Sequence, residues 1–90
     1  MRDLDPYGAA QLAAAVAALE AGDATTALAG LDRHTQAFPR SPLAQARALT
    51  RIRALCLLGR TGEARETAAS LSDTDRRLVR AQLAATCVGE

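Results

Sequence analysis

The histidine and cysteine side chains that could act as base, nucleophile or metal ligand are His34, Cys56 and Cys87. A thiol and an imidazole can carry out nucleophilic catalysis, but they need an orienting acid and an oxyanion-binding turn, and no motif for either accompanies them. Zinc ligands come in short paired spacings, which these three residues lack. We therefore predict no catalytic residue, no metal site, no cofactor and no enzymatic activity.

The same three residues fit a helical core. His34 shares a helical face with Leu31 and Phe38, so we expect its ring between helices, with one nitrogen bonded to a backbone carbonyl. Cys56 and Cys87 are 31 residues apart in predicted helices, and two thiols are too few for the disulfide framework of a small domain. We expect both cysteines to be reduced and to pack as small hydrophobic side chains.

Arginine is the other chemically active residue, with eleven copies and no lysine. Six of them gather in two predicted helices, at Arg47, Arg51 and Arg53 and at Arg76, Arg77 and Arg80. If the two helix faces adjoin, they form a basic patch that could bind phosphates or an acidic peptide. No aromatic residue is interleaved for base stacking, and ten acids lower the net charge to +1. We therefore favour a solvated face with local ion pairs and keep nucleic-acid binding as the alternative.

Composition indicates the elements that position these residues. There are 22 Ala and 13 Leu against one Ile and three Val, so strong helix formers dominate and an all-α fold is expected. Ninety residues suit one domain with one core. The longest apolar run, 12–19, is mostly Ala and far shorter than the roughly 20 residues that cross a bilayer. The N-terminus has no secretory signal pattern, and we expect no membrane insertion.

Hydrophobic periodicity and helix-end signals predict five helices, at about 6–21, 24–38, 42–58, 62–71 and 73–88. The expected N-caps are Asp5, Asp23, Ser41, Thr61 and Ser72. Pro6 and Pro42 stand at first helical positions, where proline is favoured, and Pro39 is expected to end the second helix.

Two helix junctions repeat the same pattern 37 residues apart, at Gly22 and Gly59. Each glycine ends a helix in the left-handed conformation, and Asp23 then caps the second helix. An alanine follows each glycine by five residues, Ala27 in one copy and Ala64 in the other, where the two helices must approach closely. Because a single hairpin cannot bury its apolar face alone, the two hairpins are expected to stack.

This order of helix, Gly-Asp, short helix, aromatic residue, Pro and next helix resembles the tetratricopeptide repeat (TPR). Ala27 and Ala64 fall on the family's small packing position, and Pro39 falls on its closing proline. The sequence departs from the family's pattern at Gln11, Ala14-Ala15, Ala48 and Arg51-Ile52, and its interval exceeds the usual 34 residues. The three extra residues lengthen either the joint at 39–42 or the start of the third helix. The chain is also similar to TPR-like regions of bacterial envelope-associated or sigma-factor-regulating proteins.

The resemblance implies a single domain over 1–90. In it, hairpins at about 6–38 and 42–71 form a right-handed α-α superhelix, and a helix at about 73–88 caps the open end. First helices of such hairpins line a concave groove. The expected partner-binding residues are Leu12, Val16, Leu19, Leu49, Arg53 and Leu57, joined by Arg77 of the last helix. The Lys and Asn set with which some relatives hold a terminal carboxylate is absent.

These features favour a non-enzymatic interaction module or small adaptor. An apolar groove suits a peptide, an amphipathic helix or a second copy of the chain. A free-standing chain of this kind is expected in the cytoplasm, whereas a piece of an envelope-associated protein could belong to another compartment.

Overall fold

The computed structural model describes residues 7–89, and every regular element within them is an α-helix. The six helices are α1 (Ala9–Glu20), α2 (Ala24–Ala37), α3 (Ala44–Leu57), α4 (Thr61–Ala69), α5 (Asp73–Leu78) and α6 (Arg80–Ala84). The all-α class is thus confirmed, with six helices where five were predicted. Pro39 acts as expected, because α2 ends at Ala37, with Phe38 as its C-cap. The joint between α2 and α3 runs from 38 to 43.

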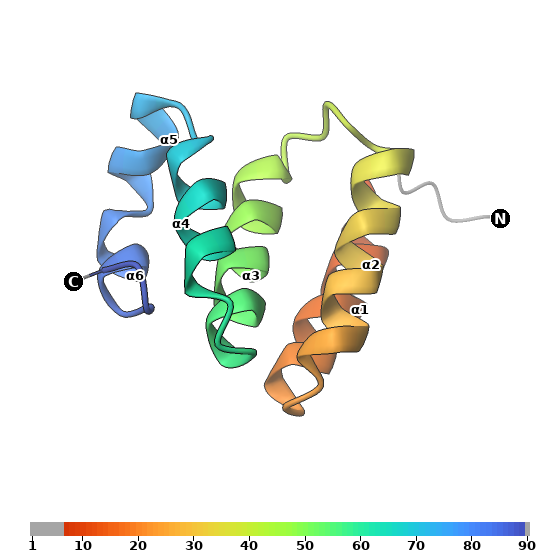
Figure 1. The fold of residues 1–90 in the computed structure, drawn as a ribbon. Coiled ribbons are helices and arrows are strands. Elements are labelled where there is room, and N and C mark those ends of the chain that lie inside the picture. Colours follow the sequence, from red (N-terminus) through yellow and green to blue (C-terminus); the bar gives the residue numbers. More distant parts are fainter. Residues whose placement is uncertain (1–6, 90) are drawn as a thin grey trace, which may run out of the picture.

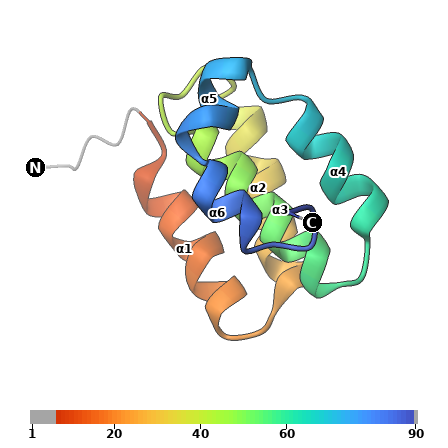
Figure 2. The same cartoon turned by 90° about the vertical axis from the view of Figure 1, so that its left-hand side faces the viewer.

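The first four helices form two hairpins that lie side by side, with α5 and α6 at the outer end (Figure 1). α1 packs on α2, and α3 packs on α4, while α3 also contacts both helices of the first hairpin. In the view turned by 90°, α1 and α4 lie at opposite edges and α6 lies in front of α3 (Figure 2). α3 is therefore the central helix of the fold.

The two hairpin joints have the same geometry. Gly22 and Gly59 have φ of 85° and 76°, a conformation that costs glycine nothing and other residues about 1–2 kcal/mol. In both joints the glycine N–H donates to the carbonyl three residues back, at 2.9 and 3.0 Å. The following N–H donates to the carbonyl five residues back, at 2.8 Å in each joint. This is the Schellman arrangement, and it confirms that both glycines end their helices.

Two predicted N-caps are confirmed. The Asp23 carboxylate accepts a hydrogen bond from the backbone N–H of Thr26 at 3.1 Å, at the start of α2. The Ser72 hydroxyl accepts from the N–H of Asp75 at 3.0 Å, at the start of α5. Hydrogen bonding from the Thr26 side chain, and next from the Thr26 backbone N–H, lowers the pKa of the Asp23 carboxyl, because the ionised oxygen is the better acceptor.

The prediction that Thr61 caps α4 is wrong. Thr61 is the first residue of α4, and Arg60 is the N-cap, with no side-chain hydrogen bond to the helix. Arg60 cannot cap because a guanidinium has no acceptor. It instead donates to both carboxylate oxygens of Glu63 at 2.7 Å, and this lowers the pKa of the Glu63 carboxyl and raises that of Arg60.

Two other predicted helix starts also differ. α3 begins at Ala44 with Leu43 as its N-cap, because the Ser41 hydroxyl forms a tighter turn, accepting from the Leu43 N–H at 3.0 Å. Asp5 and Pro6, the predicted start of the first helix, lie outside the described residues. α1 itself begins at Ala9, after Gly8 with φ of 74°.

The core runs through the seams between helices. Ala27 and Ala64 are both 0% exposed, which confirms their predicted role as close-packing residues. Ala15 and Gly30 make the matching close approach between α1 and α2, since a Cβ at Gly30 would lie 3.4 Å from that of Ala15. Three clusters of buried residues fill the domain, and Leu28 packs against all of them.

The C-terminal part differs most from expectation. α4 ends at Ala69 instead of Leu71, and the predicted helix 73–88 is two short helices that end at Ala84. The break falls at Val79, which is only 4% exposed and has helix-breaking angles of −106° and 15°. The chain bends there, buries Val79 and then folds back over α3.

Cys56 and Cys87 form a disulfide, with 5.6 Å between their Cα atoms. The expectation of two reduced cysteines is therefore wrong. The return of the chain after α6 brings Cys87 beside α3, and the Cys87 N–H lies 3.2 Å from the Cys56 sulfur. Two cysteines are too few for a disulfide framework, but they suffice for this single bond, which holds the segment after α6 on α3.

Candidate functional site

His34 lies in the core as predicted, with 0% exposure. Its Nε2 is 3.0 Å from the backbone carbonyl of Tyr7, and its Nδ1 is 3.0 Å from a guanidinium nitrogen of Arg47. The carbonyl can only accept and the guanidinium can only donate, so the ring carries its proton on Nε2 and accepts at Nδ1. Both nitrogens are engaged, which leaves His34 no free position from which to act as a base.

Arg47 completes a buried polar cluster around His34. The same guanidinium nitrogen donates to the Phe38 carbonyl at 3.0 Å, and the Ser41 hydroxyl donates to the Tyr7 carbonyl at 2.9 Å. Burial lowers the pKa of Arg47, and the neighbouring charge of Arg51 lowers it further. The cluster ties the residues before α1 to the joint between α2 and α3, so its role is structural.

The remaining candidate chemical groups do not converge either. The disulfide uses both cysteines, and no free cysteine remains in the described part of the chain. Within residues 7–89, no three His, Cys, Asp or Glu side chains are grouped so that they could hold a metal ion.

The predicted partner-binding residues are distributed over separate places. Leu12 and Val16 line a shallow apolar depression on α1, which Leu43 and Glu20 complete. Leu19 is half-buried and packs against the alanine cluster between α2 and α3, and Leu49 is half-buried on α3. The α1 depression is therefore the part of the predicted groove that stays open on the first hairpin.

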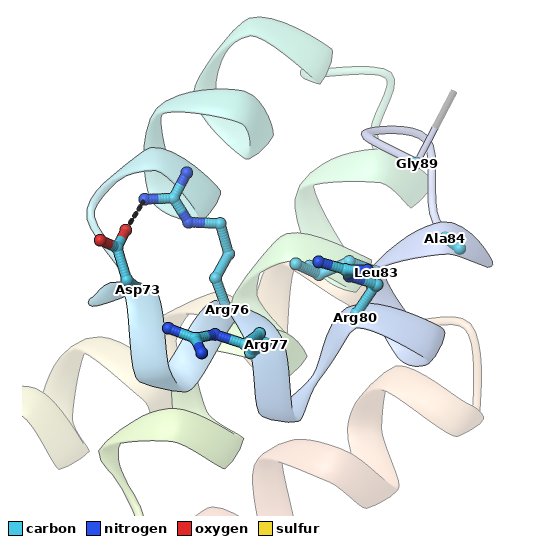
Figure 3. Close-up of a pocket in the computed structure, with 7 residues that line it drawn as sticks. All are labelled: Asp73, Arg76, Arg77, Arg80, Leu83, Ala84 and Gly89. Atoms are coloured by element: carbon cyan, nitrogen blue, oxygen red, sulfur yellow. Dashed lines mark hydrogen bonds and ion pairs between the residues drawn. The ribbon is translucent and has the colours of Figure 1, made fainter.

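Arg53, Leu57 and Arg77 lie at the other end of the domain. Arg53 and Leu57 line a depression beside the disulfide, together with Ala85 and Thr86. Arg77 lines a second depression, whose walls are residues of α5 and residues of α6 up to Ala84 (Figure 3). The C-terminal segment contributes to both depressions, with Ala84 and Gly89 in one and Ala85 to Cys87 in the other.

The six arginines do not line one depression. Arg47 and Arg51 lie together between the hairpins, where Arg47 is part of the His34 cluster and Arg51 pairs with Asp32 of α2 at 2.7 Å. Arg53 lies beside the disulfide. The other three, Arg76, Arg77 and Arg80, line the depression of α5 and α6, which we call the arginine depression.

Sequence reasoning missed two contributors to these surfaces. The disulfide positions the C-terminal segment that walls the depressions, and Gly89 packs so tightly there that a Cβ would lie 2.4 Å from the Ala84 Cα.

No protein-family model, curated protein or solved structure matches this chain significantly. The longest described helices have 14 residues, and none of the six could span a bilayer.

Proposed function

We propose that this chain is a non-enzymatic interaction module of the TPR-like kind, which binds a protein segment through the faces of α1, α3 and the C-terminal helices. The arrangement of hairpins supports this proposal. α3 contacts its own hairpin partner and both helices of the preceding hairpin, and two identical glycine joints set the hairpin geometry. This is how successive TPR units stack into a superhelix with a concave face.

Exposed apolar side chains carry the proposal. Leu57 and Leu78 are 57% and 66% exposed, and the α1 depression is lined by alanines, Leu12, Val16 and Leu43. The α1 depression gathers its apolar lining in one place, and contiguous apolar area left in water is typical of a surface that a partner covers. The partner is a peptide, a helix or a second copy of the chain.

The experiment combines partner capture with a solution-mass measurement. A double variant, Val16→Ser with Leu57→Ser, removes apolar area from the proposed face, and Leu58→Ser is the matched control from the α2 and α4 side. We expect the double variant to lose a captured partner or self-association that the control retains. Unchanged capture and mass in the double variant would count against the proposed face.

Nucleic-acid binding is the second candidate, and one observation favours it. Arg77 and Arg80 make no ion pair with any residue in the described part, so their charge is available to phosphate. A salt titration of oligonucleotide binding tests this candidate, because contacts to phosphate weaken steeply as salt rises.

The disulfide bears on where such a module works. Disulfides persist in oxidising compartments and are rare in the cytoplasm. We infer that the chain works in an oxidising compartment, in contrast to the cytoplasmic location expected from the sequence. Alkylation of free thiols at the moment of cell lysis tests this, since a chain with two blocked thiols would contradict it.

A further inference from the structure

The arginine depression combines positive charge with an apolar floor. Arg76, Arg77 and Arg80 line it with Asp73, and the side chains of Leu83 and Ala84 complete it (Figure 3). Its volume is about 420 Å³. Three guanidinium groups and one carboxylate give this small surface a local charge of about +2.

Only one of the three arginines is neutralised. Arg76 donates to the Asp73 carboxylate at 3.3 Å and to the Leu71 carbonyl at 3.4 Å. Arg77 and Arg80 are exposed, and neither makes a hydrogen bond or an ion pair with another described residue. Two guanidinium groups with open donors therefore lie in one depression.

Helix stability does not account for both arginines. Arg77 lies in the last turn of α5, where a cation interacts favourably with the peptide dipoles. Arg80 is the first residue of α6, and a cation gains nothing from the dipoles at that end. Its guanidinium charge is therefore not compensated within the described part of the chain.

The depression beside the disulfide, which is lined by the same C-terminal segment, repeats the combination. Arg53 lies there beside Leu57, which is 57% exposed. Each depression thus places a guanidinium group next to an apolar side chain. A ligand that satisfies both must carry acidic and apolar groups at short intervals.

A nucleic acid satisfies this surface poorly, because it offers bases that need aromatic stacking partners. The described aromatic residues are elsewhere, since Tyr7 precedes α1 and Phe38 packs against the His34 ring at 5.4 Å. An acidic amphipathic helix has both required features, with carboxylates on one side and leucine-like side chains on the other.

We propose that the arginine depression and the depression beside the disulfide together bind an acidic amphipathic segment of a partner protein. Carboxylates of the segment accept from Arg77 and Arg80, and its apolar side chains rest on Leu83 and Leu57. The inference rests on the proposed function, and it specifies the chemistry of the partner.

The test uses the full chain with its disulfide and two labelled helical peptides. One peptide has a leucine face and glutamates, and the other has the same leucine face with glutamines. Binding is followed by fluorescence anisotropy at low and high salt. The variant Arg77→Gln with Arg80→Gln is compared with Arg65→Gln, whose side chain is exposed on α4.

The glutamate peptide is expected to bind the unmodified chain about 2–30-fold more tightly than the glutamine peptide at low salt, the range for two exposed ion pairs. The double variant should lose that preference, and Arg65→Gln should keep it within about twofold. High salt should reduce the preference in the unmodified chain and in Arg65→Gln, and should have no such effect on the double variant.

Three outcomes would overturn the inference. Equal binding of both peptides, unaffected by the double variant, would leave the interaction module in place and remove its acidic specificity. Absence of binding by either peptide would also overturn the inference. The capture experiment on Val16 and Leu57 would then test the proposed function separately. Binding of a thymidine oligonucleotide that displaces the glutamate peptide and fails in the double variant would assign the depression to nucleic acid.

Discussion

The disulfide between Cys56 and Cys87 is predicted to supply a large part of the stability of the domain. The bond closes a loop with a sequence separation of 31 residues. The chain-entropy estimate for a loop of this length is about 3.7 kcal/mol at 25 °C, which is a substantial fraction of the 5–15 kcal/mol typical of a whole domain. Replacing both cysteines by alanine should therefore lower the free energy of unfolding by about 3–4 kcal/mol.

The loss should fall unevenly over the structure. Neither α5 nor α6 contains a buried residue, and the segment is held to the rest by Val79 and by the half-buried Leu83 and Val88. Helices of six and five residues are not stable alone. Without the bond, α6 and the residues after it should detach before the two hairpins unfold.

Urea unfolding followed by circular dichroism measures the total loss, and amide hydrogen exchange measures where it falls. The double alanine variant should unfold at markedly lower urea, and its amides from 80 to 89 should lose protection while those of α1 to α3 keep theirs. The unmodified chain in reductant should behave like the variant, since both lack the bond. An unfolding free energy within about 0.5 kcal/mol of the oxidised chain, with protection retained over 80–89, would refute this reasoning.

Four further predictions concern the hairpins. A Cβ at Gly8 would lie 2.6 Å from the Phe38 ring and 2.7 Å from that of His34, whereas one at Gly22 meets nothing. Thermal unfolding should therefore show a loss of stability of about 2–4 kcal/mol for Gly8→Ala and of about 1 kcal/mol for Gly22→Ala. Gly62→Ala, inside α4 with open space around it, should stabilise the fold by up to about 1 kcal/mol. Equal effects at Gly8 and Gly22 would contradict the packing of the residues before α1. His34→Ala removes a buried ring that bonds Tyr7 and Arg47, so urea unfolding should show a loss of about 2–4 kcal/mol, against under about 0.5 for the exposed Gln36→Ala. Leu28 packs against all three core clusters, and Leu28→Ala should cost about 2–3 kcal/mol in the same assay, more than Leu58→Ala on the exposed end of α3. Hydrogen bonds lower the pKa of the Asp23 and Glu63 carboxyls in the folded state. Each carboxylate therefore stabilises the fold above its unfolded pKa of about 4, and this contribution is lost as pH falls through the pKa of the folded state. Asp23→Asn and Glu63→Gln should lower stability at pH 7 and have no such effect at pH 2, which urea titrations at both pH values check.

The hairpins could be predicted from the sequence because local chemistry determines them. A glycine at a helix end and an alanine five residues later specify a joint and a close approach, and both copies form as expected at Gly22 and Gly59. The cap at Asp23 forms for the same reason, since a carboxylate reaches a nearby N–H. The second joint lacks such a residue, and there the predicted cap failed.

The C-terminal part could not be predicted because distant contacts determine it. The periodicity of 73–88 is that of one amphipathic helix, yet burial of Val79 and the bond to Cys56 stabilise a bent chain that returns over α3. Neither interaction can be recognised from the residues of this segment alone. The candidate binding surface could not be predicted for the same reason, because the depressions at Arg53 and Arg77 exist only where the returning segment forms their walls.

The proposed binding face therefore has two parts that depend on different interactions. The α1 depression is built from the first hairpin and Leu43, and the His34 cluster holds that region together without the disulfide. The arginine depression takes its floor from Leu83 and Ala84, on a segment that few buried contacts retain. Because the second part requires the bond and the first does not, reduction should abolish recognition of acidic partners and leave the apolar contacts of α1 available. A partner that used only the α1 depression would be insensitive to the state of the disulfide, and this separates the two parts of the face by their chemistry.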